Sequence, residues 1–186
     1  MNSTPIAPST PDVHHETSLA HFPVALFSTV MGIAGLALAW QKAAHVLGWS
    51  GLVGQGLAVL AGLVFLVVAG FYGAKLLRHW AAARAEAAHP VKMNFVPAIS
   101  IGILLLATAW GRMAPEVASW MWGLGAALHL VFTLRTMSAW IHHTHFEIQH
   151  LNPAWFIPVV GNIIVPLAGV RFAPAEVSWF FFSIGL

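Results

Sequence analysis

The chain has 186 residues, of which 59% are hydrophobic and only 8% are charged, with a formal net charge of +2 and no cysteine. A soluble domain carries about 25% charged residues, so this composition argues against one. The small net charge argues against a nucleic-acid surface, and the absence of cysteine excludes disulfides and thiolate chemistry.

The N-terminal segment is polar and rich in Pro, Ser and Thr. Residues 1–20 contain Asp12 and Glu16 but no Lys or Arg. A cleavable signal peptide needs a basic region before a short apolar core, so this segment does not fit one. We expect a disordered tail over residues 1–20 and a transmembrane domain over residues 21–186.

Five long stretches without a charged residue follow, and each is long enough to cross a bilayer as a helix. They are Thr17–Gln41, Gly51–Ala74, Met93–Gly111, Val117–Leu134 and Ile148–Val170. A sixth apolar stretch, Val177–Leu186, begins after Glu176 and continues to the last residue. The sequence therefore predicts an all-α polytopic membrane protein with five complete transmembrane helices and the start of a sixth. We expect this chain to be the front part of a longer one.

The positions of the cations predict the orientation. One side of the membrane would receive the cations after the second and fourth spans, and the other would receive those after the first, third and fifth. The first group is Lys75, Arg78, Arg84, Lys92 and Arg135; the second is Lys42, Arg112 and Arg171. Because cytoplasmic loops carry the excess of Lys and Arg, we expect a cytoplasmic N-terminus and location in the inner (plasma) membrane.

Proline divides the spans into two classes. The first span begins at Pro23, the third contains Pro97, and the fifth contains Pro158 and Pro166, whereas the second and fourth have no internal proline. Proline removes a backbone hydrogen bond, and in lipid the freed carbonyl needs a protein or water partner. We predict that the odd spans are inner, broken and cavity-lining and that the even spans are outer. The alternative is that Pro and Gly are simply common in membrane helices.

Broken helices also supply a mild attraction for anions, because their N–H groups and positive dipole ends can face one. The proposed inner spans contain no Lys or Arg to bind an anion too tightly for release. Neutral donors are available at Ser28, Thr29, Ser100, Thr108 and Asn162. The candidate pore-lining residues are Pro23, Ser28, Gly32, Pro97, Ser100, Pro158, Gly161, Asn162 and Pro166. Two alternatives are that Ser and Thr bond to their own backbone and that glycines such as Gly32, Gly35, Gly70 and Gly73 pack helices.

Histidines raise two further possibilities. His142, His143, His145 and His150 lie near Glu147 in one connection, and imidazole and carboxylate are metal ligands. Their spacing matches no recognised ligand pattern, so we favour a solvated loop and predict no metal site. His129 is the only ionisable residue within the fourth span, and we favour a neutral packing role over pH sensing.

Three segments carry a resemblance to a known family. They are Phe22–Trp40, the most specific segment Asn152–Gly169 (Asn-Pro-Ala-Trp-Phe-Ile-Pro-Val-Val-Gly-Asn-Ile-Ile-Val-Pro-Leu-Ala-Gly), and Glu176–Leu186. Together they resemble the tellurite-resistance/dicarboxylate transporter (TDT) family, which includes plant slow-type anion channels. The resemblance implies ten helices in five hairpins, with odd helices around a central pore and even ones outside. It also implies a gating phenylalanine in a ninth helix, beyond this chain, and trimers with one pore per subunit.

The expected function is transmembrane passage of small anions. The first alternative is a proton-coupled carrier of C4-dicarboxylates, tellurite or sulfite. A remote alternative is a membrane redox protein that binds haem or a metal, which would need histidines paired across facing helices. We expect no enzyme activity, because the six acidic residues lie in the tail or connections. We also expect no cofactor and no nucleic-acid partner, and we expect small anions, the lipid bilayer and a homotrimer of the full-length form as partners.

Overall fold

The computed structural model describes residues 19–142 and 153–186, and every regular element in these ranges is a helix. Five helical segments are long and apolar enough to cross a membrane: Val24–Leu47, Leu52–Arg78, Lys92–Trp110, Pro115–His142 and Pro153–Phe172. A shorter helix, α7 (Ala175–Gly185), follows the fifth. The prediction of an all-α membrane protein with five spans and the start of a sixth is confirmed.

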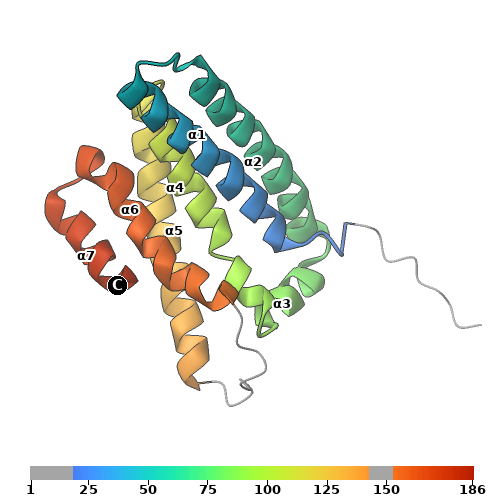
Figure 1. The fold of residues 1–186 in the computed structure, drawn as a ribbon. Helices are drawn as coiled ribbons and strands as arrows, with labels where there is room; N and C mark the ends of the chain where they lie inside the picture. Colours follow the sequence, from blue (N-terminus) through green and yellow to red (C-terminus); the bar gives the residue numbers. More distant parts are fainter. Residues whose placement is uncertain (1–18, 143–152) are drawn as a thin grey trace, which may run out of the picture.

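Successive helices pair as antiparallel hairpins. Helix α1 (Phe27–Leu47) packs on α2 (Leu52–Arg78), α4 (Ala98–Trp110) on α5 (Pro115–His142), and α6 (Ile157–Phe172) on α7 (Figure 1). The first hairpin turns at Gly48, which ends α1 with φ +70° and whose N–H bonds to the carbonyl of Ala44. Only glycine adopts this left-handed geometry without cost, so the residue fixes where α1 stops.

The odd spans share a start that the even spans lack. A short 3₁₀ turn precedes each of them: η1 (Val24–Leu26) before α1, η2 (Lys92–Phe95) before α4, and η4 (Pro153–Phe156) before α6. Pro23 and Pro97 are N-cap residues and Pro158 is the second residue of α6, where the missing N–H has no helical acceptor to lose. Pro97 and Pro158 thus lie at or beside the change from 3₁₀ turn to α-helix within the third and fifth spans, and Pro23 lies just before the first. Among the prolines of residues 19–142 and 153–186, Pro166 is the one in a helix interior.

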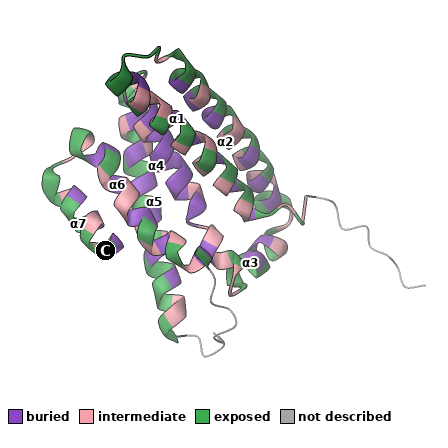
Figure 2. Cartoon of the chain, viewed as in Figure 1, coloured by how far each residue is buried: buried purple, intermediate pink, exposed green. Residues whose placement is uncertain are grey.

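Helix α4 is the centre of the described bundle. Two thirds (67%) of its span is buried, against 28–33% for the other four, and it packs against α1, α2, α5 and α6. Figure 2 shows buried residues along α4, whereas α2 and α7 have long exposed faces. Those exposed faces are apolar, as at Leu66 and Phe71, which suits contact with lipid chains.

The connection after the second span contains a helix that the sequence analysis missed. Helix α3 (Trp80–Ala88) begins after a single residue, His79, and lies across the lower ends of the long helices in Figure 1. The charged and alanine-rich segment gave no apolar stretch long enough for a span. It is a surface helix, held to the bundle by its buried residues Ala83 and Glu86.

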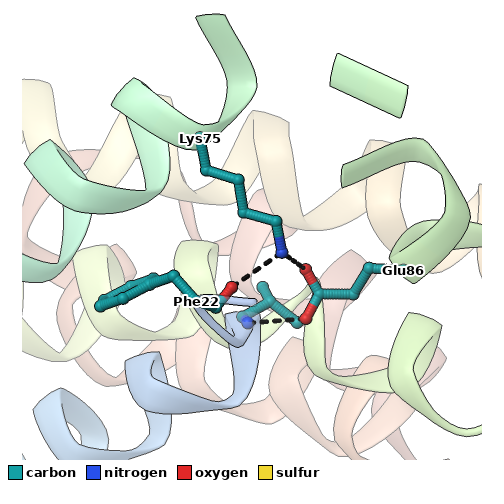
Figure 3. A network of polar contacts seen from close by, with 4 residues as sticks. Phe22, Lys75 and Glu86 are labelled. Carbon is teal, nitrogen blue, oxygen red and sulfur yellow. Dashed lines mark hydrogen bonds and ion pairs between the residues drawn. The ribbon is translucent and has the colours of Figure 1, made fainter. Parts of the chain in front are cut away.

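A buried ion pair fixes α3 to the first hairpin, as Figure 3 shows. Lys75 Nζ lies 2.6 Å from Glu86 Oε2 and donates a second bond of 2.7 Å to the carbonyl of Phe22. Glu86 Oε1 accepts from the N–H of Val24 at 2.9 Å. The carboxylate thus caps the start of the first span, where an anion was expected to bind. It also neutralises Lys75, one of the cations counted toward the orientation.

The helices extend beyond the charge-free stretches. Helix α5 continues past Leu134 to His142 and includes Arg135, while α1 includes Lys42 and α6 includes Arg171. A charge near the end of a span can reach the interface, so it does not end the helix. A search for uncharged stretches therefore places the C-terminal ends of these three helices too early.

Candidate functional site

Two groups of residues form the candidate site. The first, here called the polar cluster, comprises the side chains of Ser100, His129, Thr133 and Asn162 with the carbonyls of Pro97 and Pro158. The second, called the open face of α1, comprises Ser28, Thr29, Gly32 and Gly35. The polar cluster is buried between α4, α5 and α6, and the open face is not covered by the described residues.

Ser100 links the start of α4 to α5. Its hydroxyl donates to the carbonyl of Pro97 at 2.8 Å and lies 2.9 Å from His129 Nδ1. A serine hydroxyl has one hydrogen, so this geometry requires Nδ1 to carry a proton and donate to Ser100 Oγ. His129 Nε2 is then the buried ring atom with no hydrogen-bond partner in the described part of the chain.

Asn162 and Thr133 link α6 to α5 in the same way. Asn162 Nδ2 lies 3.0 Å from the carbonyls of Pro158 and Val159 and 3.1 Å from Thr133 Oγ1. Thr133 Oγ1 lies 2.8 Å from the Pro158 carbonyl and 2.9 Å from that of His129. Both amide hydrogens of Asn162 therefore serve protein acceptors. The amide oxygen of Asn162, Oδ1, is buried without a partner in the part of the chain that the structure describes. Because this oxygen is a hydrogen-bond acceptor, it repels an anion.

Gly161 allows α5 and α6 to approach closely. A Cβ atom at this position would overlap the ring of His129 and lie 2.7 Å from Ile101 Cδ1. Real Cβ atoms do not approach neighbours this closely, so only glycine fits. The packing interpretation of small residues therefore holds at Gly161.

The open face of α1 has the opposite character. A Cβ atom added at Gly32 or Gly35 would meet nothing within 4 Å. Ser28 is half-buried and Thr29 exposed, and neither hydroxyl makes a side-chain hydrogen bond within residues 19–142 and 153–186. Pro23 is exposed at the N-terminal end of the same span.

The structure separates the predicted pore-lining residues into two sets. Pro97, Ser100, Pro158, Gly161 and Asn162 are buried between helices, while Pro23, Ser28 and Gly32 lie on α1 or just before it with at least partial exposure. Pro166 is half-buried in α6, one residue after Val165, whose carbonyl accepts a bond of 2.9 Å from Trp122 Nε1. Of the expected donors, Ser100 and Thr108 bond to carbonyls of their own helix region, as the alternative interpretation held.

Sequence analysis missed Thr133 and gave His129 only a general packing role. Both lie on α5 four residues apart, so they share one face of the helix. The signal was a threonine one turn after the only ionisable residue of the stretch Val117–Leu134. That pattern indicates a shared polar contact, although it does not identify the helix on the other side.

A cleft lies at each end of α1. One, of about 440 Å³, adjoins the starts of the first and third spans and is lined in part by Pro23, Lys75, Glu86 and Lys92. The other, of about 180 Å³, adjoins the end of α1 and is lined in part by Gln41, His45 and Arg112. Both clefts contain cationic side chains, which favours anions near the two ends of the span.

Metal ligands do not gather in residues 19–142 and 153–186, where no group of three His, Asp or Glu side chains could hold an ion. His142 Nδ1 bonds to the Ser138 carbonyl at 2.8 Å. The remaining histidines of the 142–150 cluster, with Glu147, lie outside the described residues.

Comparison with known proteins identifies relatives of this arrangement. Residues 21–186 match the family model for the voltage-dependent anion channel, SLAC1. The S-type anion channel SLAH3 of Arabidopsis thaliana is 25% identical over 178 residues, which cover 90% of this chain and 28% of that protein. The tellurite resistance protein TehA homolog of Haemophilus influenzae is 26% identical over 166 residues, covering 88% of this chain and 50% of the relative. The chain spans half or less of the length of these relatives.

Proposed function

The chain belongs to the voltage-dependent anion channel family, and from this membership we propose that it takes part in the passage of small anions across a membrane. Two of the relatives, the S-type anion channel SLAH3 and the tellurite resistance protein TehA homolog, support anions as the substrate class. The observation that carries the proposal is the open face of α1. It offers two hydroxyls, at Ser28 and Thr29, without side-chain hydrogen bonds in the described ranges, beside two glycines with empty space above them.

Weak binding favours passage, because an anion that enters must also leave. Hydroxyl donors without a fixed charge provide this, whereas a buried cation would hold the anion. In this proposal Ser28, Thr29 and Gly32 line the path, with Pro23 at one end. The clefts beside Lys92 and Arg112 would then concentrate anions at the two ends.

The remaining candidates have a supporting role in this proposal. Ser100 and Asn162 use their donors within the protein. Ser100 bonds to the Pro97 carbonyl at the start of α4, and Asn162 bonds to the Pro158 carbonyl at the start of α6. Pro97, Pro158 and Gly161 belong to the same frame. Fixing the starts of α4 and α6 against α5 would keep the path open beside α1, since rigid supports preserve the geometry of a site. Pro166 stays a candidate for the path on α6.

Anion flux into liposomes tests the proposal. Gly32→Leu adds a bulky side chain where a Cβ meets nothing within 4 Å, so it should fill the path without disturbing the fold. The matched control is Gly70→Leu, which also meets open space but lies on the exposed face of α2. We expect Gly32→Leu to reduce chloride or nitrate flux at least about ten-fold, a barrier increase of about 1.4 kcal/mol, and Gly70→Leu to leave flux unchanged.

The same assay is also run on a longer form, in which the chain is extended to the length of its relatives, because the chain spans half or less of that length. Flux only in the extended form would mean that the path needs helices beyond residue 186. Equal flux in Gly32→Leu and the unmodified protein would contradict the assignment of the path to α1. The channel proposal fails if neither form passes chloride, nitrate or a C4-dicarboxylate.

The second candidate is a proton-coupled carrier, and His129 is the observation that favours it. The sequence offered no titratable group on the odd spans, but His129 contacts Ser100 on α4 and the position of Gly161 on α6. Those neighbours, with Ile101, carry no charge. Uptake of a C4-dicarboxylate against its gradient, driven by a pH difference and abolished by His129→Gln, would support the carrier. Flux that is indifferent to the pH difference would reject it.

The location and assembly are part of the same proposal. We infer a multi-pass protein of the inner membrane with residues 21–186 as its transmembrane domain and the N-terminus in the cytoplasm. Lys75 is neutralised by its ion pair with Glu86, so it no longer counts toward the orientation. The predicted cytoplasmic side then has four cations and the other side three. The four are Arg78, Arg84, Lys92 and Arg135, and the three are Lys42, Arg112 and Arg171. We also propose a homotrimer of the full-length form, which native mass spectrometry can test.

A further inference from the structure

The outward face of α3 has an unusual combination of residues at the membrane surface. Trp80 is 63% exposed, and Arg84 lies one helical turn later on the same face. Ala83 and Glu86, on a neighbouring side of the helix, are buried. Arg78, at the end of α2, and Lys92, at the start of η2, are also exposed.

The length of α2 sets the depth of this helix. Its 27 residues give about 40 Å at 1.5 Å per residue, which exceeds the roughly 30 Å of the hydrocarbon core. The end of α2 therefore reaches the headgroup layer. Because only His79 separates α2 from α3, α3 must begin in that layer and cannot extend far from the membrane.

The charges on this surface are not balanced by the protein. Glu86 is the only acidic residue between Lys75 and Lys92 in the sequence, and its carboxylate is buried against Lys75. Arg78, Arg84 and Lys92 make no ion pair within residues 19–142 and 153–186. Three exposed cations at headgroup depth complement the phosphates of anionic lipids, and an exposed indole suits the same layer.

We propose that the outward face of α3, with Arg78, is a binding site for the headgroup of an anionic phospholipid. Arg84 and Arg78 contact the phosphate, and Trp80 sits beside the glycerol region. The acyl chains lie against the exposed apolar surface of α2 about two turns before its end, where Phe71 is 53% exposed. The buried pair of Lys75 and Glu86 keeps α3 in this position, so the site is formed before the lipid arrives.

Native mass spectrometry of the purified chain with equimolar phosphatidylglycerol and phosphatidylcholine tests the proposal. Each cation near an anionic surface contributes a factor of about five in affinity, so Arg78→Gln with Arg84→Gln should lower the preference for phosphatidylglycerol about 30-fold. The matched control is Lys42→Gln with Arg171→Gln, which removes the same charge near the other ends of the first and fifth spans. The control should keep the preference.

Four results would overturn the proposal. The first is equal binding of the two lipids by the unmodified chain, and the second is an equal loss of preference in the control variant. The third is competition by glycerol phosphate or inorganic phosphate at the concentration of the lipid, which would indicate a site for soluble phosphate. A second copy of the chain bound at this face would appear as a dimer that disappears in Arg78→Gln/Arg84→Gln, and this outcome also counts against a lipid.

Discussion

Gly161 and Gly35 have opposite environments in this protein. The difference decides whether a methyl group added at each position would lower the stability of the protein. Gly161 faces His129 and Ile101 at less than the distance that a Cβ needs, whereas Gly35 faces open space. The sequence places both inside apolar spans and offers no means to tell them apart. Only the approach of a second helix distinguishes a packing glycine from one beside an empty region.

Gly161→Ala should destabilise the protein by about 1–3 kcal/mol, because the added methyl group overpacks the contact with His129. Gly35→Ala should leave stability unchanged or raise it by up to about 1 kcal/mol, since alanine is the better helix former. Thermal unfolding in detergent, followed by circular dichroism, measures both. Equal effects of the two substitutions would show that the close contact at Gly161 is wrong.

The two threonines of the same face of α5 provide a second comparison. Thr133 and Thr136 are both buried, but only the Thr133 hydroxyl has hydrogen-bond partners in the described part of the chain. Thr133→Val should lower stability by about 1 kcal/mol, within the range for such bonds in membrane proteins, because Asn162 also loses a partner. Thr136→Val should be near neutral. A thermal scan that ranks Thr136→Val as the more harmful change would contradict the polar cluster.

At the scale of elements, the uncharged stretches were enough to predict the five spans, because a transmembrane helix requires a long apolar run. The prolines indicated which spans differ, but not that the difference is a 3₁₀ turn at the start. Helix α3 was missed because its stability comes from one buried ion pair to a distant residue. Such a contact is decided by the folded arrangement and leaves no periodic signal in nine residues.

Breaking the pair of Lys75 and Glu86 should release α3. Lys75→Met or Glu86→Gln alone should cost about 3–5 kcal/mol, because each leaves a buried charge without its partner. The double variant Lys75→Met/Glu86→Gln removes both charges, and the oxygen of the introduced amide can still accept from the Val24 N–H, so much of the stability should return. Thermal unfolding reports the cost, and hydrogen exchange in residues 80–88 reports the release.

Additive losses in that double variant would mean that the two side chains act independently. Residues 80–88 should exchange faster in each single variant than in the double variant. Exposed Arg84→Gln serves as the control on the same helix, since it changes charge without touching the pair.

For the whole molecule, the orientation is the prediction that needs a direct measurement. The chain has no cysteine, so a single introduced thiol reports one position. Ser50→Cys, between α1 and α2, should react with an impermeant maleimide in intact cells, because an N-terminus in the cytoplasm puts this turn outside. Ala87→Cys on α3 should react only after permeabilisation. The reverse pattern would invert the topology and the side on which the lipid site lies.

The family and the general architecture could be predicted from sequence because both depend on long, regular patterns. The assignment of residues to the path could not. Ser100 and Asn162 read as available donors along the sequence, yet the folded chain directs their hydrogens to proline carbonyls. Whether a polar group can bind an anion depends on whether it is already hydrogen-bonded to another part of the protein. Its partners on the facing helix are 25–29 positions away in the chain.

The capping of Val24 by Glu86 has a consequence for biogenesis. The two residues are 62 positions apart, and translation proceeds at roughly 5–20 residues per second. The carboxylate that fixes the start of the first span is therefore synthesised about 3–12 s after Val24 itself. During that interval the start of this span has no anchor, and the arrival of α3 completes the first hairpin. A ribosome pause just before residue 86 would extend the period in which this hairpin is open to insertion errors.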